Sequence, residues 1–143
     1  MKVPLVSLAL ATLLLAGCAG TPAVPDQPEV LSADRAAAGA VSISQHEFRF
    51  DSTQDAVRRG VVDFAITNQG NEHHEFVIVP YSDGRFGEPV AEHEALDPGE
   101  SGVLRVSLNP GRYRLVCLLV TVKPEGPVSH IALGMDRALE VTP

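Results

Sequence analysis

Between residues 41 and 142 the chain consists of short segments in which apolar and polar residues alternate, separated by turn-forming residues. Apolar residues occupy every second position at 62, 64 and 66 and again at 104, 106 and 108, and the turn sequences NQG (68–70) and NPG (109–111) follow these two segments. A period of two is that of a β-strand with one buried face, whereas a long helix would need a 3.6-residue period. About seven such segments in about 100 residues predict an all-β fold, a Greek-key antiparallel β-sandwich.

The expected strands differ in how they are buried. The segment 74–80 is apolar on both faces, as a central strand would be. In 41–50 the apolar positions change phase between Ile43 and Phe48, which predicts a bulge or a bend between two sheets. The acidic stretch 88–101 is expected to be a long connection with room for a short helix. The remaining strands are expected in 60–67, 102–108, 112–120 and 137–142.

The N-terminus has the features of an export signal followed by a linker. Residues 1–17 contain Lys2 and an apolar run too short to span a bilayer, which predicts a secretory signal peptide. The sequence Leu15-Ala16-Gly17-Cys18 resembles the lipobox of bacterial lipoproteins, which implies cleavage before Cys18 and its acylation. The alternative is a plain secreted protein that is cut nearby. Residues 18–40, rich in Ala and Pro, are expected to be a flexible tether to a domain at 41–143.

A lipidated Cys18 would leave Cys117 as the one thiol of the mature chain. The sequence has two cysteines, so an internal disulfide would then be impossible in an oxidising compartment. Cys117 is therefore expected to be either buried and inert or held as a thiolate by a metal ion. A lone buried cysteine is more often a small hydrophobic residue than a ligand.

Charge and motifs disfavour two function classes. The chain has 18 acidic and 11 basic residues, a net charge of −7, and no basic run, so nucleic-acid binding is not expected. The sequence has no G-x-S-x-G elbow, phosphate-binding glycine loop or zinc-protease helix, and an inward-facing thiol on a strand is poorly placed to meet a substrate. We therefore expect a protein that is not an enzyme.

Strand geometry predicts which soft side chains face the interior. Side chains two apart share a face, so Cys117 lies on the face opposite Arg112 and Arg114 and is expected to point inward. His74, at the start of its strand, is the histidine that we expect to face inward, and His73 lies on the other face. The start of one strand lies beside the end of its antiparallel neighbour, so His74 and Cys117 can meet at one end of the sandwich.

The order of these residues resembles that of the cupredoxins, the blue copper proteins of the plastocyanin and azurin type. The similarity covers 41–142 and includes NQGNEHHEF at 68–76, the stretch 97–117 with its PG-x-Y turn and Y-x-x-x-C, and a later His and Met. The resemblance implies one copper ion, Cu(I) or Cu(II), with a trigonal set of His74, Cys117 and His130 and a long axial bond to Met135. His73 would be a neighbour or a secondary metal contact. His46 and His93 are expected at the surface.

The interval between Cys117 and His130 departs from the family pattern, in which only a few residues separate these ligands. Here twelve residues, 118–129, lie between them. Lengthening a loop from about three to about twelve residues adds about 1.2 kcal/mol of loop-closure free energy, whereas metal binding can contribute about 10 kcal/mol of stabilisation. The sequence predicts a hairpin, with 118–122 and 128–133 as its arms, that would place His130 opposite Leu119 or Cys117.

Together these features predict a lipid-anchored, periplasm-facing copper protein of the cell envelope that transfers one electron at a time. Its expected partners are redox proteins or copper-handling proteins, and Cys18 would attach it to the membrane. The outer membrane is favoured, because Ala19 and Gly20 carry no acidic retention signal. The alternatives are copper delivery or resistance without redox turnover, and a metal-free cupredoxin-like interaction module.

Overall fold

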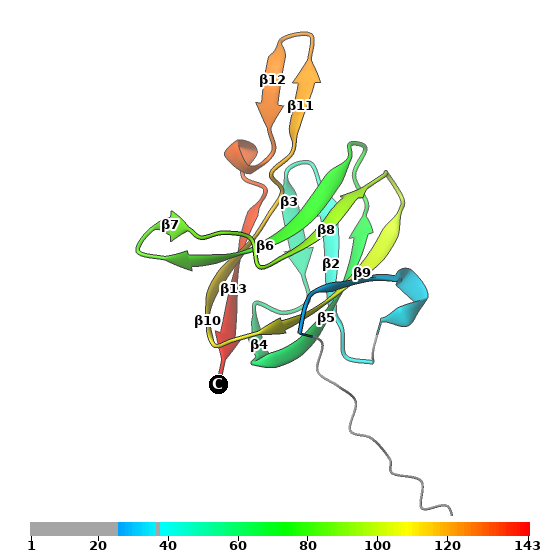
Figure 1. Cartoon of the computed structure of the whole chain (residues 1–143). Coiled ribbons are helices and arrows are strands. Elements are labelled where there is room, and N and C mark those ends of the chain that lie inside the picture. The colour runs from blue at the N-terminus through cyan, green and yellow to red at the C-terminus, as the bar shows by residue number, and fades with distance from the viewer. Residues whose placement is uncertain (1–25, 37) are drawn as a thin grey trace, which may run out of the picture.

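The computed structural model describes residues 26–36 and 38–143, which form a sandwich of two β-sheets (Figure 1). The first sheet has the order β1-β9-β5-β2-β3. Its strands are β1 (Glu29–Ser32), β2 (Val41–His46), β3 (Arg49–Ser52), β5 (Gly60–Asn68) and β9 (Ser101–Leu108). The signal segment 1–17, Cys18 and the first part of the expected tether lie outside the described residues.

The second sheet has the order β4-β13-β10-β6-β7, and β8 pairs with β6 beside this path. Its strands are β4 (Ala56–Arg58), β6 (His74–Ser82), β7 (Arg85–Phe86), β8 (Ala91–Leu96), β10 (Gly111–Val116) and β13 (Asp136–Thr142). Most neighbours in the two sheets are antiparallel, but β2 and β5 are parallel, as are β4 and β13. The all-β Greek-key sandwich expected from the sequence is therefore confirmed, with two parallel pairs added.

A third, two-stranded sheet projects from one end of the sandwich (Figure 1). It consists of β11 (Val120–Lys123) and β12 (Gly126–Ser129), and we call residues 120–129 the flap hairpin. The short 3₁₀ helix η2 (Ile131–Leu133) follows it, and another, η1 (Ala33–Arg35), follows β1. The hairpin expected within the twelve-residue interval is thus present, but its arms are shorter than the expected 118–122 and 128–133. Strand β10 ends at Val116 instead of continuing to 120, and residues 131–133 form η2.

The core lies between the two sheets and contains residues from nearly every strand. Phe64, Leu104 and Leu115 have no exposed surface, and the alternation of buried and exposed residues in β2 and β9 follows the apolar pattern of the sequence. Cys117 and Met135 belong to this same cluster of buried residues. The sulfur-containing side chains are therefore part of the sandwich core at one of its ends.

Three local expectations need correction. The phase change in 41–50 is a turn between β2 and β3, which pair with each other, and not a bulge or a bend between sheets. The stretch 88–101 contains strand β8 instead of a helix, because Ala91, His93 and Leu96 are buried beside β6. Residues 29–32, assigned to the tether, form β1 and pair with β9, so the sheet begins earlier in the chain than expected.

In residues 26–36 and 38–143, no helix has the length and apolar character that crossing a membrane requires.

Candidate metal centre

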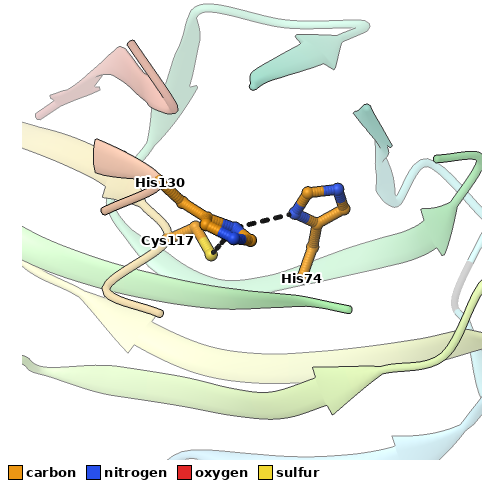
Figure 2. A group of neighbouring side chains, drawn as sticks. All are labelled: His74, Cys117 and His130. Carbon is orange, nitrogen blue, oxygen red and sulfur yellow. Dashed lines mark hydrogen bonds between the residues drawn. The ribbon is translucent and has the colours of Figure 1, made fainter. Parts of the chain in front are cut away.

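Three elements bring His74, Cys117 and His130 together at one end of the sandwich (Figure 2). His74 is the first residue of β6, Cys117 follows β10, and His130 precedes η2. All three side chains have 0% exposed surface. His130 Nδ1 lies 3.2 Å from His74 Nδ1 and 3.4 Å from Cys117 Sγ. The three ligand atoms lie within 4.8 Å of one another, a spacing that allows them to bind one metal ion.

Met135, the fourth expected ligand, lies beside these residues along the backbone. The Met135 amide donates to the His130 carbonyl at 3.1 Å, and the Cys117 amide donates to the Met135 carbonyl at 3.2 Å. Gly134, with φ +105°, ends η2 in the left-handed conformation that glycine adopts without a steric penalty. The turn at Gly134 thus returns the chain to the core, where the Met135 side chain is fully buried.

The flap hairpin explains how the long interval still brings His130 to Cys117. Its register pairs Val120 with Ser129, and the His130 amide donates to the Leu119 carbonyl at 3.0 Å. The two ends of the hairpin therefore lie side by side, and His130 is as close to Cys117 as a short loop would place it. His130 lies opposite Leu119, one of the two positions expected from the sequence.

The outer nitrogen of His74 faces a carboxylate of the sandwich. His74 Nε2 lies 3.3 Å from Glu47 Oε1, and the same oxygen accepts the amides of Asn71, at 2.5 Å, and Glu72, at 2.9 Å. Burial raises the pKa of the Glu47 carboxyl, but these amide donors and His74 outweigh burial and lower the pKa to about 2. Since ionised Glu47 can only accept, His74 Nε2 carries the proton and its Nδ1 lone pair faces the cluster.

The loop that presents these amides is shaped by Asn68 and Gly70. Asn68 is fully buried, its side-chain amide donates to the carbonyls of Glu72 and Leu96, and its side-chain oxygen accepts the Gly70 amide at 2.9 Å. A Cβ at Gly70 would lie 2.4 Å from Glu47 Oε1, closer than real Cβ contacts come. Glycine at position 70 therefore allows Glu47 to approach His74.

The outer nitrogen of His130 faces the flap hairpin. His130 Nε2 lies 2.8 Å from Thr121 Oγ1 in β11 and 3.6 Å from Glu72 Oε2. Glu72 also forms an ion pair with Lys123, whose side chain lies over the ring of Phe48. Burial, together with the neighbouring His74, lowers the pKa of His130. The neutral imidazole, the form that binds metals, is therefore favoured at this position.

Burial raises the pKa of the Cys117 thiol. The backbone immediately after Cys117 is fixed by Glu75, whose carboxylate accepts the Leu118 amide at 2.5 Å. A buried thiol with a raised pKa ionises when a cation binds the sulfur, because the metal stabilises the thiolate.

The other histidines lie apart from this cluster. His73 is exposed, its Nδ1 lies 2.6 Å from Asp97 Oδ1, and it is not among the three ligand atoms that the structure brings together. His46 is partly exposed and lies 3.3 Å from Asp51. His93 was expected at the surface, but it is buried beneath Gly102, where a Cβ would lie 2.0 Å from the imidazole.

The donor set has the chemistry of a copper site. Two imidazole nitrogens and a cysteine sulfur, with a methionine buried beside them, form the His₂Cys combination with a weak axial thioether that suits Cu(I) and Cu(II). The two inner nitrogens lie 3.2 Å apart, a spacing at which both can bind one cation. The buried cluster therefore fits a single copper ion.

No protein-family model and no curated protein sequence matches this chain. Solved structures do match. Auracyanin B is 22% identical with a TM-score of 0.55, over 73% of this chain and 88% of that one. Reduced auracyanin from Roseiflexus castenholzii is 19% identical with a TM-score of 0.55, over 75% and 99%. Auracyanin A from Chloroflexus aurantiacus, described as a "blue" copper protein, is 17% identical with a TM-score of 0.51, over 73% and 100%. The chain has the fold of these proteins, a cupredoxin β-sandwich.

Proposed function

We propose that this protein is a one-electron carrier whose copper ion is bound by His74, Cys117 and His130, with Met135 as the axial ligand. The main support is the convergence of three fully buried donor atoms within 4.8 Å of one another, on a cupredoxin sandwich. Copper, when bound, exchanges one electron between Cu(I) and Cu(II) on a donor set that suits both states. The protein residues hold the ligands in place and exclude water from them.

Burial favours electron transfer over copper delivery. A delivery protein passes its ion to a partner by ligand exchange, which requires that the partner reach the donor atoms. Here the three donors have 0% exposed surface, and the outer edge of His130 lies against Thr121 of the flap hairpin. A site of this kind retains its ion while electrons pass to redox partner proteins.

Absorption and electron paramagnetic resonance spectra of the copper-loaded chain test this proposal. We expect one copper ion per chain and an intense thiolate-to-copper band that disappears in Cys117→Ala. Met135→Leu is the matched variant, because it keeps an apolar side chain of similar volume and should retain the band while changing the reduction potential. Tight Cu(I) binding without such a band in the Cu(II) form would favour copper delivery. Colourless, non-stoichiometric uptake would favour a metal-free interaction module.

We further propose that the carrier is anchored in the cell envelope, facing the periplasm, through acylated Cys18. The support is sequence alone, namely the export signal and the lipobox-like LAGC at 15–18. Cys18→Ser should abolish incorporation of labelled fatty acid and release the protein from the membrane fraction. Retention of Cys18→Ser in that fraction would contradict the anchor while leaving the copper site unaffected.

A further inference from the structure

The flap hairpin presents two different faces. Along β11, Val120 and Val122 are exposed, and Val122 has 82% of its surface open to solvent. Thr121 and Lys123 alternate with them and point to the sandwich, where they contact His130 and Glu72 respectively. Because strand side chains alternate between faces, this inward pair is fixed by the register of the hairpin. The inward face lies directly behind an expected copper ligand.

We propose that Thr121 and Glu72 are positioning residues for His130, which hold the proton on Nε2 and thereby direct the Nδ1 lone pair at the metal. This inference rests on the proposed function, and it assigns the flap hairpin a role in the site. Metal-bound histidines usually donate their second N–H to an oxygen of the protein or to water, which fixes both the tautomer and the ring orientation. Here the oxygen comes from a side chain of the hairpin.

Glu72 favours the tautomer with the proton on Nε2, whereas a proton on Nδ1 would face His74 Nδ1 at 3.2 Å. Were the proton on Nδ1, the Nε2 lone pair would face the Glu72 carboxylate at 3.6 Å. Glu72 Oε2 is buried and has no hydrogen-bond partner among the described residues, and an N–H on His130 Nε2 would point its positive end toward this oxygen. With the proton on Nε2, the bond to Thr121 Oγ1 at 2.8 Å runs from imidazole to hydroxyl.

Lys123 keeps this arrangement together. Its ammonium group pairs with Glu72 Oε1 and lies 5.9 Å from the centre of the Phe48 ring. Phe48 in turn packs edge-on against His130, with ring centroids 4.9 Å apart. The imidazole of His130 is therefore enclosed by Phe48, Thr121 and Glu72, and Lys123 connects the hairpin to the loop that contains Glu72.

Thr121→Val tests the assignment, because it removes the hydroxyl and keeps the shape. We expect on the order of 10- to 100-fold weaker copper affinity, measured by competition with a chelator, together with a shifted reduction potential. Thr121→Ser retains the hydroxyl and should restore most of the affinity. Val122→Thr is the matched control, since it adds a hydroxyl at the next residue on the exposed face and should bind copper like the wild type.

The tautomer is measured separately by nitrogen NMR of the imidazole of His130 in the metal-free full chain. A proton on Nε2 in the wild type that moves toward Nδ1 in Thr121→Val supports the inference. This result would hold even if the chain took up no copper, an outcome that would refute only the proposed function. A proton on Nδ1 in the wild type, or unchanged copper affinity in Thr121→Val, would overturn it. Equal losses in Thr121→Val and Thr121→Ser would also overturn it, because they would indicate packing instead of hydrogen bonding.

Discussion

The two histidines of the candidate copper site are supported by different parts of the molecule. The outer nitrogen of His74 meets Glu47, and the backbone amides of Asn71 and Glu72 fix the same carboxylate oxygen. The outer nitrogen of His130 instead meets Thr121, a side chain of the flap hairpin. One ligand is thus held by the sandwich body, and the other by an element outside its two sheets.

Because of this difference, we expect the residues that determine the stability of the fold to differ in part from those that assemble the copper site. The sandwich body contains the hydrophobic core, whereas the hairpin has only two strands and exposes Val120 and Val122. A two-stranded hairpin is at best marginally stable by itself, so its order depends on contacts with the body. Changes in the body should therefore affect both stability and copper binding, and changes in the hairpin should mainly affect copper binding.

The largest expected effect comes from the body. Leu104→Ala removes a side chain with 0% exposure between the sheets, and truncation of a buried leucine costs about 2–5 kcal/mol of unfolding free energy. Urea unfolding of the metal-free chain measures this cost. Leu133→Ala in η2, where the leucine is 55% exposed, is the control and should change stability by less than about 0.5 kcal/mol. Similar losses in both variants would contradict the expectation that the buried core of the body determines stability.

The next effect should appear in both stability and copper affinity. Glu47→Ala leaves the amides of Asn71 and Glu72 and the imidazole N–H of His74 without their acceptor. Loss of such an acceptor costs about 1–3 kcal/mol, and loss of a ligand's hydrogen-bond partner weakens metal binding about 10- to 100-fold. Calorimetry of the metal-free chain and chelator competition measure the two effects. Glu125→Ala, on the exposed turn of the hairpin, is the control and should change neither the unfolding free energy nor the copper affinity.

Much of this arrangement could be predicted from the sequence, since it depends on local periodicity. Alternation identified β5, β9 and the inward direction of Cys117, and the expected hairpin has the register that brings His130 to Leu119. Strand β8 was missed because its glutamates suggested a solvated connection. The copper ligand roles of the four residues remain a prediction.

The partners of the outer nitrogens could not be predicted. Glu47 is 27 residues from His74, and Thr121 is nine from His130, so their contacts arise only when the sheets and the hairpin fold. Neither residue has a distinctive sequence pattern. Only the short interval between Thr121 and His130, read together with the hairpin register, would have placed that pair on facing arms.

The smallest expected effect on stability comes from the ion pair between the hairpin and the body. Lys123→Met keeps the aliphatic chain over Phe48 and removes the charge that pairs with Glu72. Partly exposed ion pairs contribute about 0.2–1 kcal/mol, so the unfolding free energy should change little. The hairpin would be held less firmly over His130, and copper should transfer to a chelator several-fold faster than from the wild type. Glu125→Gln removes a charge from the same hairpin without touching this ion pair, and its rate should stay unchanged. A Lys123→Met variant that lost stability but released copper at the wild-type rate would mean that the hairpin supports the fold and not the site.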